Sequence, residues 1–144
     1  MFFPSSITKN MDDDLSPDSE FYSTGVCVTD DDIPAKTLYW IGDSIWCVEV
    51  QQAIFDNSPE IIVCHAGGNK FFKEYPIFRE SFKGDSDPVI MDAQQVIELS
   101  YYALNAKIIA THMGALDHET VSQKYLREYS QLEGVNSSQL YIPV

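Results

Sequence analysis

Residues 37–46 read TLYWIGDSIW, and this stretch decides how the rest of the chain is interpreted. Its first half, Thr37–Ile41, is rich in aromatic and β-branched residues and predicts a short β-strand. The following residues break the strand, and Ser44 can cap a helix that we expect to continue to about Asn57. A strand that leads directly into a helix is the repeating unit of α/β domains.

The segment before this stretch predicts an antiparallel hairpin. Gly25–Val28 is another β-rich run, and only Thr29–Lys36 separates it from the next strand. So short a link cannot hold the crossover helix that a parallel pair needs, so the two strands are expected to pair antiparallel. The acidic tip of the link, Asp30–Asp32, is expected to be a solvated turn.

The downstream part alternates between predicted strands and helices. Three more strands are predicted. Ile61–Cys64 and Lys107–Ala110 are uninterrupted apolar runs, which are typical of strands covered on both faces, and Gln139–Ile142 is a short final strand. Two helices lie between them. Asp92 can cap the first, and Thr120 with Gln123 forms a capping box for the second, which ends near Gly134.

We expect each helix to bury one face at helical spacing. The residues predicted to face the core are Trp46, Val50, Ala53 and Ile54 in the first helix, Ala93, Val96, Ile97, Tyr101 and Leu104 in the second, and Val121, Tyr125, Tyr129 and Leu132 in the third. The order β-β-α-β-α-β-α-β predicts an α/β fold with a mixed sheet, an initial hairpin and helices packed over the sheet. Residues 1–23 have no periodic pattern and are interpreted as an irregular lead-in to one domain formed by residues 24–144.

The composition argues against some classes of function. The chain has 22 acidic and 9 basic side chains and a formal net charge of -13. Nucleic acids and anionic membranes are bound through Lys and Arg, so neither is an expected partner. The cysteines Cys27, Cys47 and Cys64 form no C-x-x-C motif and are typical of a reducing compartment. Neither a signal peptide nor an apolar run of membrane-spanning length is present, so we expect a cytoplasmic protein.

Three polar residues lie just past the carboxyl ends of predicted parallel strands: Asp43, His65 and His112. Parallel strands bring their carboxyl ends to one edge of a sheet, and open α/β sheets bind ligands at that edge. We therefore expect the three side chains to converge, near enough for one cation to touch two of them. Carboxylate oxygen and imidazole nitrogen are suitable ligands for zinc or a related divalent ion.

Each candidate residue also has a simpler structural interpretation. Asp43 could cap the following helix, and His65 could be hydrogen-bonded within the tight loop that follows it. His112 could be a satisfied core histidine, and His118 could simply be exposed. Cys64 beside His65 is a poor catalytic dyad, because adjacent strand residues point to opposite faces.

The order of several short motifs resembles the metallo-β-lactamase superfamily, in its branch of small cytosolic hydrolases. GDSIW (42–46) follows a strand, where the branch has Gly-Asp-Ser/Thr, often with Ile-Trp after it. PEIIVCHAGG (59–68) stands where the branch usually shows Asn-Ala-Gly-Gly, and MDA (91–93) opens a helix. THMGALDH (111–118) stands where His-Met-Glu-Ala and then Asn-His are common. The match spans roughly residues 24–142, and the combination is more specific than any single motif.

The resemblance implies a metal-dependent hydrolase that acts on a small-molecule substrate. It implies that Asp43 bridges two divalent ions, zinc or else manganese, and that His112 is a ligand of the second ion. It also implies catalytic roles for Asp43 and His118. Two neighbouring cations need an anionic bridge to offset their repulsion, and a dinuclear site can activate water for attack at phosphoryl or acyl centres.

The chain departs from the superfamily pattern at several positions. The upstream His-x-His-x-Asp-His motif and an intermediate histidine, which supply most of the metal ligands, are missing. His65 stands where Asn is usual, Gly114 where Glu is common, and Asp117 where Asn is common. The superfamily fold is an αββα sandwich of two similar halves, and this chain corresponds to the C-terminal half. We therefore expect a poorly covered sheet face, with a missing N-terminal half or a homodimer partner over it.

The leading functional hypothesis is a metal-dependent hydrolase of this superfamily, present as an N-terminally incomplete chain that is inactive alone. Asp43 and His112 are too few ligands for a closed catalytic site. One alternative is a non-catalytic interaction module that presents an acidic face. Another is a phospho-receiver domain with Asp43 as acceptor, although the short link at Thr29–Lys36 leaves no room for the helix that such a domain requires.

Overall fold

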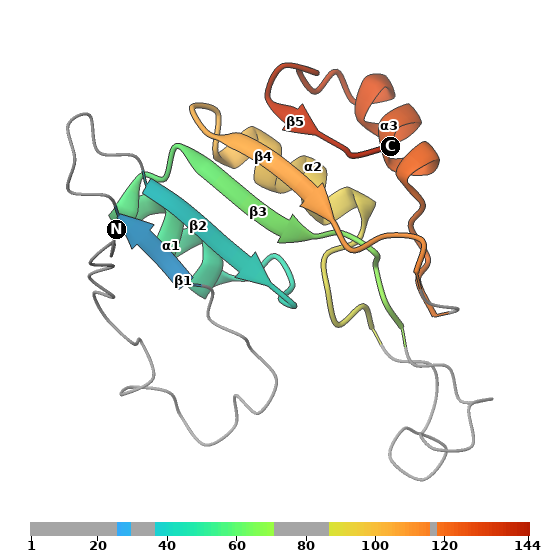
Figure 1. Cartoon of the computed structure of the whole chain (residues 1–144), viewed down its shortest axis with the longest axis horizontal. Coiled ribbons are helices and arrows are strands. Elements are labelled where there is room, and N and C mark those ends of the chain that lie inside the picture. Colours follow the sequence, from blue (N-terminus) through green and yellow to red (C-terminus); the bar gives the residue numbers. More distant parts are fainter. Residues whose placement is uncertain (1–25, 30–36, 71–86, 116–117) are drawn as a thin grey trace, which may run out of the picture.

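A computed structural model of the chain describes residues 26–29, 37–70, 87–115 and 118–144. Along these residues the elements follow the predicted order β-β-α-β-α-β-α-β (Figure 1). Three predicted features lie outside the described residues: the lead-in at 1–23, the acidic turn at 30–32 and the position of Asp117.

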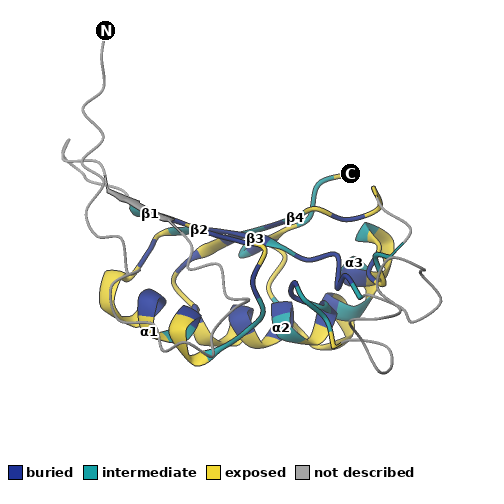
Figure 2. Cartoon of the chain, turned by 90° about the horizontal axis from the view of Figure 1, so that it is seen from below, coloured by how far each residue is buried: buried dark blue, intermediate teal, exposed yellow. Residues whose placement is uncertain are grey.

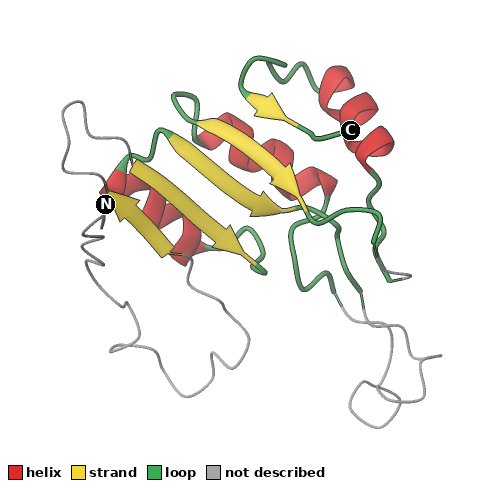
Figure 3. Ribbon diagram, viewed as in Figure 1, coloured by secondary structure: helices red, strands yellow, loops and turns green. Residues whose placement is uncertain are grey.

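The described residues form a five-stranded mixed sheet (Figure 3). Its strands lie side by side in chain order: β1 (Val26–Thr29), β2 (Thr37–Gly42), β3 (Ile61–His65), β4 (Lys107–Thr111) and β5 (Leu140–Tyr141). β1 pairs antiparallel with β2, which confirms the predicted hairpin. β2, β3, β4 and β5 are parallel, so their carboxyl ends share one edge of the sheet.

The helices of the described part lie on one side of the sheet (Figure 2): α1 (Val48–Asn57), α2 (Ala93–Tyr102) and α3 (Gln123–Leu132). Between helices and sheet lies an apolar core that contains Ile41, Ile62, Cys64, Ile108 and Ala110 from the strands, and Val50, Val96, Leu99 and Leu126 from the helices. Its removal from water is the main term that stabilises the fold. No helix in the described part has the length and apolar composition of a membrane span.

The caps of α2 and α3 follow local side-chain chemistry. The Asp92 carboxylate accepts the Gln95 backbone N–H at 3.0 Å, and the Gln95 side chain bonds back to the Asp92 N–H at 3.4 Å, so the predicted Asp92 cap is confirmed. α3 is capped by Ser122, and the predicted Thr120 cap is wrong. The Thr120 hydroxyl donates instead to the Gly68 carbonyl oxygen at 2.8 Å, because the loop after β3 lies against it.

α1 begins later than the sequence predicts. Its first residue is Val48, and its N-cap, Cys47, makes no side-chain cap hydrogen bond. Ser44 is buried, and its carbonyl oxygen accepts the Met91 N–H at 3.1 Å. The predicted Ser44 cap is therefore wrong, because a tertiary contact fixes this residue in the loop before the helix.

Some residues predicted to face the core are exposed: Tyr101, Leu104, Tyr125 and Leu132. Leu104 lies beyond the end of α2, which stops at Tyr102. In α3 the buried residues are Leu126 and Ser130. The Tyr101 hydroxyl donates to the Glu133 carbonyl oxygen, and the ring of Tyr125 stacks on that of Tyr129 at a centroid distance of 5.8 Å.

The opposite face of the sheet carries apolar side chains with no described helix over them. They alternate along the strands with the core residues: Leu38, Trp40, Ile61, Val63, Ile109 and Tyr141. Trp40 is 48% exposed and Tyr141 is 61% exposed, although large aromatic side chains are commonly well buried. We call this surface the open face. It agrees with the expectation of a poorly covered sheet face.

Candidate metal centre

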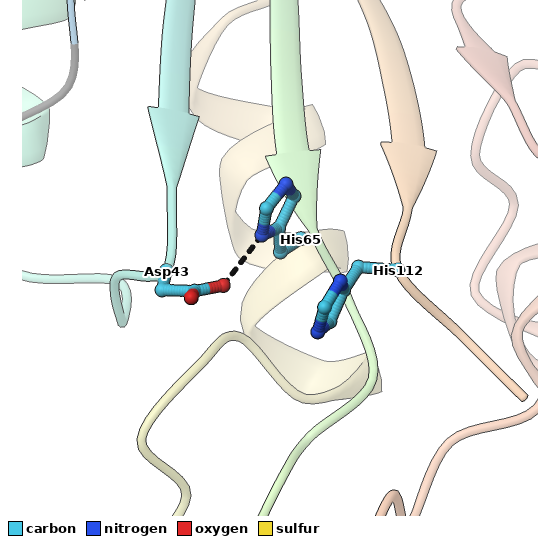
Figure 4. A group of neighbouring side chains, drawn as sticks. All are labelled: Asp43, His65 and His112. Atoms are coloured by element: carbon cyan, nitrogen blue, oxygen red, sulfur yellow. Dashed lines mark hydrogen bonds and ion pairs between the residues drawn. The ribbon is translucent and has the colours of Figure 1, made fainter. Parts of the chain in front are cut away.

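Asp43, His65 and His112 meet at the carboxyl edge of three neighbouring parallel strands (Figure 4). Asp43 follows β2, His65 ends β3 and His112 follows β4. Each residue offers one ligand atom, and these atoms all lie within 4.8 Å of one another. The predicted convergence is confirmed, and it includes all three residues, which we call the trio.

Asp43 is held by the turn that ends β2. Gly42 has a φ of 69°, which glycine adopts without steric cost, and the strand register shifts between Trp40 and Gly42. The Ser44 N–H donates to the Gly42 carbonyl oxygen at 3.1 Å and closes the turn. The Asp43 side chain is 63% exposed. Because α1 starts after Cys47 without a side-chain cap, the helix-cap interpretation of Asp43 is wrong.

His65 is the most enclosed member of the trio, with a side chain that is 17% exposed. Its Nδ1 lies 2.5 Å from Oδ1 of Asp43, a short charge-assisted hydrogen bond from the ring N–H to the carboxylate. The ring meets Trp40 edge-on at a centroid distance of 5.9 Å. It stacks on His112 at 4.6 Å with an interplanar angle of 10°. The hydrogen-bond partner of His65 is therefore Asp43 rather than the loop that follows.

His112 presents its side chain outward from the end of β4. Its φ of 57° lies in the left-handed region, which is uncommon for a residue other than glycine and is maintained by the surrounding structure. The neighbouring backbone is fixed by a hydrogen bond from the Ala66 N–H to the Thr111 carbonyl oxygen at 2.9 Å. The His112 side chain is exposed, so the interpretation as a core histidine is wrong.

Backbone hydrogen bonds join the loops that carry the trio. The Met91 N–H donates to the Ser44 carbonyl oxygen at 3.1 Å, and the Gly68 N–H donates to the Met91 carbonyl oxygen at 3.0 Å. The Gly67 carbonyl oxygen in turn accepts the Thr120 N–H at 2.9 Å. The loops after β2, β3 and β4 are thus connected through their backbones, which fixes the relative positions of the backbone segments that carry the trio.

The sequence alone gave Gly67 no role beyond a tight loop. A Cβ at this position would lie 2.6 Å from the His112 carbonyl oxygen and 2.5 Å from Oδ1 of Asn69. Glycine therefore allows the loop after β3 to lie directly against the end of β4. Beside it, Oδ1 of Asn69 and Oε1 of Glu119 are buried without a hydrogen-bond partner among the described residues. No local sequence signal reveals these contacts, because they join residues far apart in the chain.

His118 is not part of the trio. It is half-buried in the turn after β4, so the expectation of a simply exposed residue is wrong. Its carbonyl oxygen accepts the Lys70 N–H at 3.0 Å, which places its backbone beside the loop after β3. The catalytic role of His118 stays a prediction.

Cys64 precedes His65 in the chain but belongs to the core on the helix side of the sheet. Its burial raises the pKa of the thiol to about 12. The thiol therefore stays protonated near neutral pH, where a nucleophilic cysteine would need to ionise. The rejection of a Cys64–His65 dyad is confirmed.

The chemistry of the trio fits a divalent transition metal. Imidazole nitrogen and carboxylate oxygen are both common zinc ligands. In the described part of the chain, no lysine or arginine forms an ion pair with Asp43, so a basic side chain does not neutralise its carboxylate. The net charge of -13 favours the approach of cations further.

No protein-family model matches the chain. Among curated proteins, it is similar to UPF0173 protein YddR of Bacillus subtilis (strain 168), with 32% identity over 103 residues, which are 72% of this chain and 36% of that protein. Among solved structures, it is similar to a possible metal-dependent hydrolase from Veillonella parvula DSM 2008, with a TM-score of 0.68 and 25% identity. It is also similar to isothiocyanate hydrolase from Delia radicum gut bacteria, with a TM-score of 0.67 and 25% identity. Both matches cover 83% of this chain and 40% of the other chain.

A more distant match shows the fold alone. It is the metallo-β-lactamase fold protein YhfI from Bacillus subtilis, with a TM-score of 0.51 and 14% identity over 83% of this chain and 39% of that chain. This chain therefore spans less than half the length of each of these similar proteins. The predicted resemblance to the metallo-β-lactamase superfamily is confirmed, and the chain has the metallo-β-lactamase fold over the part that it spans.

Proposed function

We propose that the chain is a metal-binding part of a hydrolase of the metallo-β-lactamase superfamily that acts on a small-molecule substrate. The observation that carries the proposal is the convergence of Asp43, His65 and His112, whose ligand atoms lie within 4.8 Å of one another. Two of the similar structures are named as hydrolases, one as possibly metal-dependent and one of isothiocyanates, and they support the reaction class.

In this proposal Asp43 and His112 would hold the metal, and the Asp43 carboxylate would offset the repulsion between the two ions of a dinuclear site. A bound zinc or manganese ion supplies Lewis acidity and activates water near neutral pH. The hydrogen bond from His65 occupies Oδ1 of Asp43, which leaves Oδ2 for a further interaction. His112 is exposed, so its ring nitrogens are accessible from solvent.

We assign a proton-transfer role to His118. Imidazole both accepts and donates a proton near neutral pH, which suits a general acid or base. The hydrogen bonds from Lys70 N–H to the His118 carbonyl and from Thr120 N–H to the Gly67 carbonyl keep this loop beside the loop after β3. These contacts support a position at the carboxyl edge of the sheet, where the trio lies.

We also propose that this polypeptide hydrolyses little by itself. A dinuclear site needs more ligands than Asp43 and His112 supply. The open face, on which Trp40 is 48% exposed, is expected to be covered by a complementary N-terminal half of the domain or by a second copy of the chain. The chain spans 36% of one similar protein and 40% of two others. These shares support a complementary half of the domain, rather than a second copy of the chain, as the cover of the open face.

Metal analysis and hydrolysis assays on the same samples test this function. Zinc content after dialysis and turnover of phosphodiester, lactone and isothiocyanate probes are measured for the wild type, Asp43→Ala and Asp56→Ala. Asp56 is an exposed carboxylate on α1 and is the matched control. We expect zinc retention, and any turnover, to be lost in Asp43→Ala and kept in Asp56→Ala. Turnover that persists in Asp43→Ala or after complete chelation would contradict the proposal.

A second candidate function is a non-catalytic interaction module, which the open face and the net charge of -13 favour. It predicts association without any metal requirement, so a chelator that leaves association unchanged and a chain that retains no zinc would support it. The phospho-receiver hypothesis is not supported. Such a domain requires parallel strands where β1 and β2 form an antiparallel pair.

A further inference from the structure

His65 is held more firmly than the other two members of the trio. It ends β3 in register with Thr111 of β4, and the rings of Trp40 and His112 contact its own ring. Its side chain is 17% exposed, whereas that of Asp43 is 63% exposed. The strand fixes the backbone of His65, and the low exposure of its side chain gives its imidazole less freedom than the exposed side chains of Asp43 and His112 have.

We propose that His65 is a third metal ligand, so that Asp43, His65 and His112 form a three-ligand site for one divalent transition-metal ion within this chain. The proposal rests on the proposed function for Asp43 and His112, and it adds His65, for which the superfamily resemblance implies no ligand role. Three protein ligands and one water form the usual coordination shell of a catalytic zinc ion. The described residues of this chain thus provide a full set of protein ligands for one ion.

The separation of the three ligand atoms fits one ion after a small adjustment. Two ligands at about 2.0–2.1 Å from a tetrahedral zinc ion lie about 3.4 Å from each other. The three atoms lie within 4.8 Å of one another, and the distance of 2.5 Å between Nδ1 of His65 and Oδ1 of Asp43 is that of a hydrogen bond. For His65 to serve as a ligand through Nδ1, this nitrogen would have to give up its proton to solvent and its hydrogen bond to Asp43. The exposed Asp43 side chain can turn to widen the gap.

The stacked rings set a second requirement. The lone pair of an imidazole nitrogen lies in the plane of the ring, and the rings of His65 and His112 are nearly parallel, with an angle of 10°. Two stacked rings cannot direct their lone pairs at one point. Binding therefore requires His112, the exposed ring, to turn out of the stack while His65 stays in place. A coordination bond then replaces the stacking contact.

Zinc titration by calorimetry tests the proposal, with the wild type compared with variants in which one of the three histidines is replaced by asparagine. Asparagine at position 65 can still hydrogen-bond to Asp43 but offers no imidazole nitrogen. We expect one zinc ion per wild-type chain. Loss of a direct ligand in His65→Asn or His112→Asn should lower zinc affinity at least as much as loss of an outer-shell partner, roughly 10–100-fold. His118→Asn removes the remaining histidine and should keep the wild-type affinity.

A direct readout separates a ligand from a residue that only orients Asp43. With an NMR-active cadmium isotope and nitrogen-labelled histidine, a coordinated ring nitrogen shows one-bond coupling to the metal, and a hydrogen-bonded nitrogen does not. We expect this coupling at His65 and His112. Circular dichroism and thermal unfolding of the metal-free variants establish that each one folds.

The outcomes are distinguishable. A folded His65→Asn variant with wild-type affinity, or a cadmium complex without coupling at His65, overturns the third-ligand proposal. If Asp43→Asn and His112→Asn still lose zinc, the ligands of the proposed function remain. A folded wild-type chain that binds neither zinc nor cadmium overturns both proposals.

Discussion

The carbonyl oxygen of His112 lies 2.6 Å from the position that a Cβ on Gly67 would occupy. The two residues lie in the loops that follow the neighbouring strands β3 and β4, and the atom that a Cβ would meet belongs to the backbone. A side chain at position 67 therefore cannot be accommodated by a change of rotamer. The place of His112 at the edge of the sheet depends on a glycine elsewhere in the chain.

We predict that Gly67→Ala lowers both stability and zinc affinity, because the end of β4 has to move to admit a methyl group. Overpacking of this kind costs about 1–3 kcal/mol, which chemical denaturation measures. Gly134→Ala is the control. Its φ of 75° makes alanine unfavourable there as well, but Gly134 follows the far end of α3. The Gly134→Ala variant should lose stability and keep its zinc affinity. Equal zinc affinity in the Gly67→Ala and Gly134→Ala variants would show that the Gly67 contact does not position His112.

Asp92 should be the strongest single capping residue of α2. Asp92→Ala removes the acceptor of the Gln95 N–H hydrogen bond and should cost about 1 kcal/mol in the free energy of unfolding. Gln95→Ala removes only the longer return bond of 3.4 Å and should cost less. Urea unfolding of the two variants measures the difference. A smaller loss in Asp92→Ala than in Gln95→Ala would contradict the capping geometry.

Stability at alkaline pH should depend on Cys64. Burial raises the pKa of this thiol from 9.0 to about 12, so the folded chain keeps it protonated where the unfolded chain ionises it. The contribution of the protonated Cys64 thiol to the free energy of unfolding is fully present below pH 9 and is lost as the pH rises toward 12. In this window the free energy of unfolding of the wild type should fall, relative to Cys64→Ala, by about 1.4 kcal/mol per pH unit. If the free energy of unfolding changes with pH in the same way for both proteins, the raised pKa of Cys64 is refuted.

The exposed apolar side chains of the open face should cause the isolated chain to self-associate or to bind hydrophobic probes. At micromolar concentration we expect self-association by light scattering or binding of a hydrophobic dye, and we expect Trp40→Gln to weaken either signal. Phe55→Gln is the matched control, because Phe55 is an exposed aromatic residue of α1, on the helix side of the sheet. A monomer that binds no dye, or an equal response in both variants, would argue that the face needs no partner.

The sequence predicted the strands well because each of them shows a local signal. Ile61–His65 and Lys107–Thr111 carry apolar side chains on both the core face and the open face, so their apolar character is continuous. The helix faces were less predictable. The pattern around Tyr125 suggested burial, but α3 starts at Gln123 after the Ser122 cap, because the Thr120 hydroxyl donates instead to the Gly68 carbonyl oxygen across the fold.

In the site, too, some features could be predicted from the sequence and others depend on tertiary contacts. Asp43, His65 and His112 could be grouped from the sequence because the topology of parallel strands places their ends together. The hydrogen bond between His65 and Asp43 and the stacking of His65 on His112 could not be predicted, because they depend on the left-handed φ of 57° at His112 and on the turn at Gly42. Tertiary contacts impose these conformations.

β1 runs antiparallel to β2, with Val26 opposite Trp40 and Thr29 opposite Thr37. The polypeptide therefore joins the sheet at the edge where Asp43 lies and leaves β1 at the opposite edge. Val26, where β1 begins, therefore lies at the edge of the sheet that also carries the trio. Because β1 begins at the edge that carries the trio, zinc stoichiometry has to be measured on protein from which any polyhistidine tag ahead of the chain has been cleaved.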